Sequence, residues 1–235
     1  MTLRFPFHHP EIEAILVRLH EEARRDKWRL APHVPFYFWA SLSNRLKQGP
    51  GQLPMFRDVY SAVTEERGAI LYLIARAIQA RRVVEFGSSF GISTIYLATA
   101  VRDNTSSASG PAPSVIGSEM EPQKCEAATR NLQAAGLSDI ARIVQGDALE
   151  TLRPVEAPLD LVFLDGRKDL YLPVLKLLKP KLRNGAVVLS DNIDSFKREV
   201  APFLEYVQSG ANGFASSTVN ISDGIELSVY EGTVG

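Results

Sequence analysis

Two amphipathic helices are predicted in the first eighty residues of the chain. Between Glu11 and Trp28, apolar side chains recur at helical spacing and charged side chains fill the opposite face. A second helix is predicted from about Val63 to Ala80, with Thr64 as a candidate N-cap in front of two glutamates. The stretch from Arg29 to Met55 carries four prolines, so we expect an irregular linker between the two helices.

From residue 82 onward, short apolar runs alternate with helical stretches. Five runs have the composition of buried strands: RVVEFG, SVIGSEM, ARIVQGD, LDLVFLDG and GAVVLSDN. The predicted helices lie at Ile92 to Val101, Pro122 to Ala135, Asp169 to Leu182 and about Ser195 to Gln208. Because the runs are apolar throughout and alternate with helices, the pattern indicates βαβ units and a parallel sheet covered on both faces.

The last part of the chain predicts a hairpin. The stretch SSTVNISDGIELSVYEG contains two strand-like runs around Asp223-Gly224, a dipeptide typical of tight antiparallel turns. The expected fold class is therefore α/β: a doubly wound, mostly parallel seven-stranded sheet of Rossmann-like type, with an antiparallel C-terminal hairpin and an N-terminal helical extension. We divide the chain into an extension over residues 1–60 and a main domain over residues 61–235.

Composition and charge exclude several classes of partner. The net charge of −1 and the pI of about 6.4 leave no broad basic field for nucleic acid. No window approaches the ~20 apolar residues of a membrane span, and the N-terminus lacks the apolar core of a signal peptide. Cys125 is the only cysteine, which fits a reducing cytoplasm. For the assembly, a homodimer is kept as the working expectation.

The glycine-flanked turn Gly87 to Gly91 is the candidate ligand loop, because ligands of open α/β sheets lie beyond the carboxyl ends of the strands. A P-loop needs Lys and Ser or Thr after its last glycine, whereas Gly91 is followed by Ile92 and Ser93. A dinucleotide site prefers G-x-G-x-x-G, and Glu85 would repel its pyrophosphate. S-adenosylmethionine has no phosphate, and Glu85 can pair with its cationic end.

Acids end three successive predicted strands. Glu119 ends the second, where a carboxylate can accept both hydroxyls of a ribose, and Asp147 ends the third, close to where an adenine would lie. Each acid taken alone could also be a solvated strand end or a helix cap. Together with the glycine loop, the three acids favour an S-adenosylmethionine site.

The sequence resembles the class I S-adenosylmethionine-dependent methyltransferases. More narrowly it is similar to the cation-dependent O-methyltransferases, which include catechol O-methyltransferase and the caffeoyl-CoA O-methyltransferases. The narrower resemblance is carried by FLDGRKDLYLP, Phe163 to Pro173, and LSDNI, Leu189 to Ile193. It implies Mg²⁺ or another divalent cation at Asp165, Asp191 and Asn192, and Lys168 as the general base. The cofactor residues that it implies are Val63, Glu85, Gly87, Ser93, Glu119, Met120, Asp147, Ala148 and Asp165.

The expected activity is methyl transfer to a hydroxyl of a small, phenolic acceptor, with help from the metal. Catechol O-methyltransferase has a glutamate shortly before its last hairpin, whereas this chain has Ser216 to Val219 there, which argues against catechol itself. Alternatives are a metal-independent methyltransferase on the same fold, an NAD-dependent oxidoreductase and a non-catalytic cofactor-binding module. The candidate walls of the acceptor pocket are Phe36, Tyr37, Trp39 and Tyr171.

Overall fold

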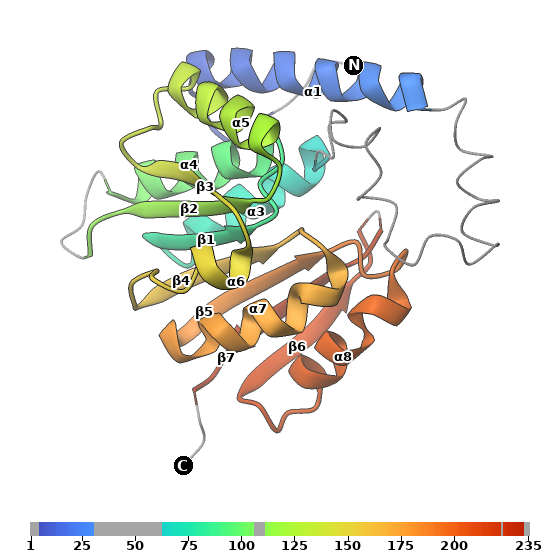
Figure 1. Cartoon of the computed structure of the whole chain (residues 1–235). Helices are drawn as coiled ribbons and strands as arrows, with labels where there is room; N and C mark the ends of the chain where they lie inside the picture. The colour runs from blue at the N-terminus through green and yellow to red at the C-terminus, as the bar shows by residue number, and fades with distance from the viewer. Residues whose placement is uncertain (1–4, 31–62, 106–110, 222, 233–235) are drawn as a thin grey trace.

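The computed structural model describes residues 5–30, 63–105, 111–221 and 223–232, which form a seven-stranded sheet between two layers of helices (Figure 1). The strand order is β3-β2-β1-β4-β5-β7-β6. The strands are β1 Arg82–Phe86, β2 Ser114–Glu119, β3 Ala141–Gln145, β4 Leu159–Leu164, β5 Leu182–Asp191, β6 Phe214–Val219 and β7 Ile225–Tyr230. The first five are parallel, and β7 runs antiparallel to both β5 and β6. The predicted fold class is confirmed, including the C-terminal hairpin.

The helices divide between the two faces of the sheet. The bounds are α1 Pro10–Leu30, α3 Glu65–Ala77, α4 Ile92–Thr105 and α5 Pro122–Ala134 on one side, and α6 Ala148–Thr151, α7 Tyr171–Leu178 and α8 Lys197–Gln208 on the other. Successive strand residues point to opposite faces of the sheet. Val83 packs against the layer of α1, α3, α4 and α5, and Val84 packs against the layer of α6, α7 and α8. Strands with two covered faces need apolar side chains at every position, which is the pattern of the sequence.

The N-terminal helix packs on the main domain. On α1, Ile12, Leu16 and Leu19 are fully buried in the same core cluster as α3 and α4. Arg18 also donates to Asn131 Oδ1 of α5 at 3.0 Å, and Figure 1 shows α1 running beside α5. The division of the chain at residue 60 stays a prediction. Most of the predicted linker, together with Phe36, Tyr37 and Trp39, lies outside the described residues.

Two predicted helices differ in extent from those observed. The helix predicted from Val63 to Ala80 covers Glu65–Ala77, because Thr64 caps it by accepting a hydrogen bond from the Arg67 N–H. The helix predicted from Asp169 to Leu182 is divided into a 3₁₀ turn, α7 and a second 3₁₀ turn, Lys179–Lys181. Pro180 lies in that second turn and has no N–H with which to continue α7.

Among the residues that the structure describes, no helix combines the length and apolar character that a membrane crossing would require.

Candidate functional site

The carboxyl ends of β1, β4 and β5 bring the predicted site residues to one edge of the sheet. Phe86 pairs with Leu164, and Leu164 pairs with Ser190, so Gly87 and Asp165, which start loops, lie level with Asp191, the last residue of β5. The N–H of Asp165 donates to the Phe86 carbonyl at 2.9 Å. The two loops also press together at Gly87, where a Cβ would lie 2.5 Å from the backbone of Gly166. The φ of +93° at Gly87 is a second reason for glycine there.

Glu85 holds the glycine loop together from inside. Its side chain is fully buried, and Oε2 accepts hydrogen bonds from the hydroxyls of Ser88, at 2.7 Å, and Thr94. Burial raises the pKa of Glu85 to about 6 and the charge of Asp165 adds to this, while the nearby hydroxyls, that of Ser93 first, oppose it. Because Ser88 lies in the loop and Thr94 in the first turn of α4, Glu85 ties the loop to the helix that follows it. The sequence predicted a direct pairing with a cationic cofactor, which stays a prediction.

Glu119 connects two loops at the end of β2. Oε2 accepts from the Ser89 N–H at 2.7 Å and Oε1 from the Glu121 N–H at 2.9 Å. Ser89 has a φ of +47°, so the carboxylate stabilises a backbone conformation that serine seldom adopts. The Glu119 side chain therefore stands against the glycine loop, as the sequence-based hypothesis requires. Met120, the next residue, is exposed.

Asp147 and Ala148 lie at the end of β3. The Asp147 side chain accepts from the Leu149 N–H at 2.8 Å and caps α6, while its contact with a cofactor stays a prediction. Asp147 is exposed and Ala148 is buried. Val63 and Ser93, also predicted cofactor residues, lie near the N-terminal ends of helices. Val63 is buried just before the cap of α3, and Ser93 is buried in the first turn of α4.

Oxygen atoms from the ends of β4 and β5 converge on the ammonium group of Lys168. Nζ lies 3.1 Å from Asp165 Oδ1, 3.1 Å from Asn192 Oδ1 and 2.6 Å from the Tyr171 hydroxyl. The side chains of Lys168 and Asp165 are only 11% and 13% exposed. The structure thus brings the predicted base and two of the three predicted metal ligands together around one cationic centre.

Asp191, the third predicted ligand, is held by different partners. Its Oδ2 accepts from Arg67 Nη1 at 2.8 Å, and its Oδ1 accepts from the Asn192 N–H at 2.8 Å. The ion pair is buried, with side-chain exposures of 9% for Arg67 and 2% for Asp191. Burial raises the pKa of Asp191 to about 7, and Asp165 adds to this, whereas Arg67 lowers it. Sequence reasoning missed Arg67, whose only signal was its place in the first turn of a helix.

The donor set suits a cation, with one condition. The described residues contain no group of three or more histidine, cysteine or acidic side chains arranged as a metal centre, and the predicted set has two acids and an amide. Asp165 Oδ1 and Asn192 Oδ1 already share one positive charge, that of Lys168, and carboxylate and amide oxygens are the ligands that Mg²⁺ prefers. These two residues fit a divalent cation once Lys168 Nζ moves aside, with Asp191 adding charge beside them.

Tyr171 is part of the core, and its prediction as an acceptor wall is wrong. The side chain has no exposed surface, and its hydroxyl donates to the Asp191 carbonyl at 3.0 Å. Its ring packs edge-on against Phe86 and Phe203. A ring enclosed by the core cannot line a pocket. The half-buried Phe196, whose ring centroid is 5.8 Å from Lys168 Nζ, is a partly exposed aromatic side chain beside the cationic centre.

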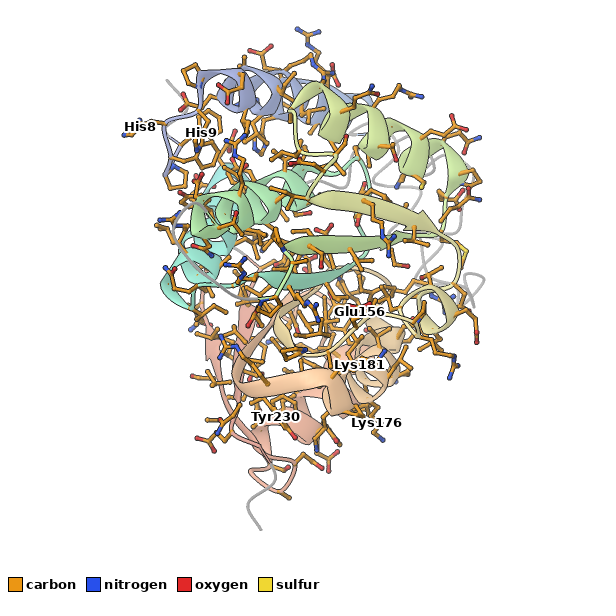
Figure 2. All side chains as sticks on the ribbon, turned by 90° about the vertical axis from the view of Figure 1, so that its left-hand side faces the viewer. His8, His9, Glu156, Lys176, Lys181 and Tyr230 are labelled. Carbon is orange, nitrogen blue, oxygen red and sulfur yellow. The ribbon has the colours of Figure 1, made fainter. Side chains whose placement is uncertain are left out.

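Charged side chains at the amino ends of the strands, opposite the candidate site, make structural contacts. Glu156 and Lys181 lie just before β4 and β5 begin (Figure 2). Lys181 Nζ donates to the carbonyls of Arg153 and Val155 at 2.5 and 2.6 Å. These contacts hold the segment between α6 and β4 against the start of β5.

Comparison with known proteins gives matches that cover much of this chain. Residues 84–193 match a family model described as a methyltransferase domain. Catechol O-methyltransferase of Mycobacterium tuberculosis is 40% identical over 133 residues, which are 56% of this chain and 57% of that protein. Among solved structures, cofactor-bound Rv0187 from MTB is 29% identical with a TM-score of 0.65, covering 85% of this chain and 90% of its own. The O-methyltransferase TomG from Streptomyces achromogenes, in complex with SAM, is 28% identical with a TM-score of 0.64. The match covers 74% of this chain and 84% of TomG.

The chain spans 57–66% of the length of the first four curated relatives that it matches, all of them catechol O-methyltransferases.

Replacing Glu85 by Gln should remove a pH dependence of stability. The native carboxyl keeps its proton up to about pH 6, whereas the unfolded one releases it near 4.5. The contribution of Glu85 to the free energy of unfolding therefore falls as the pH rises through this interval and is level above it. Relative to Glu85→Gln, the wild type should lose about 2 kcal/mol between about pH 4 and pH 7.

Urea denaturation of both proteins across this pH range measures the effect. Glu156→Gln, at an acid whose side chain is 82% exposed, is the matched control and should follow the wild type. Parallel curves for the wild type and Glu85→Gln would contradict the raised pKa.

Proposed function

Since the chain belongs to the class I S-adenosylmethionine-dependent O-methyltransferases, we propose that it transfers the methyl group of S-adenosylmethionine to a hydroxyl of a small, phenolic acceptor with the help of a divalent cation. The observation that carries the proposal is the meeting of the glycine loop with the oxygens of Asp165 and Asn192 at one edge of the sheet. The first supplies a place for the cofactor and the second a place for a cation.

The geometry of Glu119 supports its role in cofactor binding. Each of its oxygens accepts one backbone N–H, and a carboxylate has about four lone-pair sites, so acceptor capacity remains for the two hydroxyls of a ribose. The same N–H bonds fix the carboxylate against the glycine loop. Relatives with a bound cofactor, such as TomG in complex with SAM, support this choice of ligand.

Asp165 and Asn192, with Asp191 next to them, are the residues that would hold the cation. When bound, a divalent cation would supply Lewis acidity that lowers the pKa of an acceptor hydroxyl. Phe196 borders this position and would pack against an aromatic acceptor. The protein's own contribution is then orientation: an acceptor oxygen brought in line with the methyl group and its sulfur, in a site from which water is excluded.

Lys168 would take the proton of the acceptor hydroxyl at Nζ. The methyl group leaves the sulfonium sulfur with its bond electrons remaining on sulfur, and a new bond forms to the acceptor oxygen as that oxygen loses its proton. Nζ can accept this proton only when it is neutral, whereas here it donates hydrogen bonds to Asp165 and Asn192. Lys168 therefore has to leave those oxygens before it can act as a base.

A metal-independent methyltransferase is the second candidate, and one observation favours it. The carboxylates of Asp165 and Asp191 are each already paired with a cationic side chain, Lys168 and Arg67. In that case Lys168 would keep its ammonium form and orient the acceptor by hydrogen bonding.

Radiolabelled S-adenosylmethionine and a panel of phenols, with and without EDTA, test both candidates. We expect transfer to at least one phenol, a loss of activity in EDTA and recovery on adding Mg²⁺. Full activity in EDTA would select the metal-independent enzyme. Binding of NAD instead of S-adenosylhomocysteine in titration calorimetry would select an oxidoreductase, and cofactor binding without transfer to any acceptor would leave a binding module.

Glu119→Ala should weaken the binding of S-adenosylhomocysteine by about 2 kcal/mol, roughly a thirtyfold higher Kd, because two ribose hydroxyls lose a charged acceptor. Titration calorimetry measures the change. Glu150→Ala removes an exposed acid of the nearby helix α6 and should leave the Kd unchanged. An unaltered Kd for the Glu119 variant would remove this residue from the cofactor site.

Lys168→Ala should lower kcat by about 10² or more, with little effect on cofactor affinity, because positioned proton transfer is lost. Lys168→Arg should not restore the rate, since a guanidinium stays protonated. Rates against pH for both variants are the measurement, and a higher pH should partly restore the alanine variant. Lys176→Ala, at an exposed lysine of α7, is the control. An arginine variant as fast as the wild type would rule out the role of general base.

A further inference from the structure

The turn of the C-terminal hairpin lies directly on the loop that follows β5. The Asp194 N–H donates to the Asp223 carbonyl at 3.1 Å, and the Ile193 N–H donates to the Gly224 carbonyl at 3.4 Å. The Ser195 hydroxyl donates to Asp223 Oδ1 at 2.7 Å. A Cβ at Gly224 would lie 2.6 Å from Asp194 Oδ2 and 2.8 Å from Ile193 Cγ1, and its φ of +73° also favours glycine. The turn therefore fixes the position of the loop that starts at Asn192.

Asn192 has a left-handed backbone conformation, and the oxygen and nitrogen of its amide face different partners. Its φ is +58°, in the left-handed region. The amide oxygen faces Lys168 and Asp165, and the amide nitrogen donates to Asp223 Oδ2 at 3.4 Å. An amide oxygen can bind a cation, whereas an amide NH₂ group cannot. Which way the amide is turned therefore decides whether Asn192 is a ligand.

We propose that Asp223 is a positioning residue for the cation site, and that its carboxylate keeps the Asn192 amide oxygen turned toward Asp165. An ionised carboxylate only accepts hydrogen bonds, so it can face only the NH₂ end of the amide. Lys168 favours the same orientation from the other side, but this contact is lost whenever Nζ moves away. The Asp223 contact does not depend on Lys168. The inference rests on the proposed function, because it concerns the ligand set of the proposed metal.

Binding of Mn²⁺ alone to the full chain, followed by the electron paramagnetic resonance signal of free Mn²⁺, tests the inference without any turnover. Asp223→Ala should raise the Kd for Mn²⁺ by about 10- to 100-fold, the usual effect of removing a partner that orients a metal ligand. Asp223→Asn, which keeps the shape of the side chain but can donate to the amide oxygen, should also weaken binding. Asp194→Ala removes an exposed acid from the same loop and controls for the loss of charge.

A double-mutant cycle separates orientation from electrostatic attraction. If Asp223 acts through Asn192, adding Asp223→Ala to Asn192→Ala should change the Kd for Mn²⁺ by less than about threefold. The Kd for S-adenosylhomocysteine should stay at its wild-type value in every variant, which also reports that each has folded. If Asp223→Ala is unfolded by this measure, the comparison is made with Asp223→Asn.

Three outcomes overturn the inference. Wild-type Mn²⁺ affinity in Asp223→Ala and Asp223→Asn, with binding abolished in Asp165→Ala, overturns the inference alone and keeps the proposed metal. An equal loss of affinity from Asp223→Ala in the wild-type and Asn192→Ala backgrounds shows that only charge matters. A wild type that does not bind Mn²⁺ overturns the metal and the inference together, while methyl transfer can still be tested with phenols in EDTA.

Discussion

Two carboxylates stand at neighbouring strand ends with little access to water, and each needs a positive charge at hand to remain there. Asp191 is almost completely buried and is paired with Arg67, and Asp165 is paired with Lys168. Removing one partner from such a buried pair leaves a charge without compensation, at a cost of about 3–5 kcal/mol. The position of α3, which supplies Arg67, and the 3₁₀ turn after β4, which supplies Lys168, both follow from this requirement.

The pairing of Lys168 with Asp165 and Asn192 means that the amino group can have two positions, bound to these oxygens or released from them. With Lys168 on Asp165 and Asn192, the amino group is a structural cation, and its lone pair is not available for chemistry. With those oxygens taken by another cation, the amino group is released beside the position that we assign to the acceptor. In the proposed mechanism, binding of the metal and activation of the base would then be one event, because the same two oxygens, which now accept from Lys168, would bind the metal.

The sequence contained enough to predict the sheet and the strand-end residues, because both depend on local patterns. Apolar runs bounded by turns locate the strands, and parallel strands bring their carboxyl ends to one edge. The choice of Asp165, Asn192 and Lys168 at that edge came from the family resemblance. The pairing of Arg67 with Asp191 crosses 124 positions of sequence and leaves no local trace. The same holds for Asp223 and Asn192, which are 31 positions apart. Asp223 was recognised only as a turn residue, because Asp-Gly is a turn signal in any hairpin.

The burial of Tyr171 and the full enclosure of Glu85 were missed for a related reason. A tyrosine at the start of a predicted helix has the same local pattern whether it points into the core or into a pocket. An acid at the end of a strand likewise gives no indication of which neighbours will cover it. Burial is decided by helices that pack from elsewhere in the chain, here α8 through Phe203 for Tyr171 and α4 through Thr94 for Glu85.

The place of β7 in the sheet has a consequence for how the protein forms on the ribosome. This strand is the last of the described strands in sequence, yet it lies between β5 and β6. Until residue 230 has emerged, β5 has an open, apolar edge that could pair with another chain. Asp223, which accepts a hydrogen bond from the Asn192 amide, emerges with the same segment. A nascent chain can therefore assemble the glycine loop early, but Asn192 gains its contact with Asp223 only when the sheet is closed.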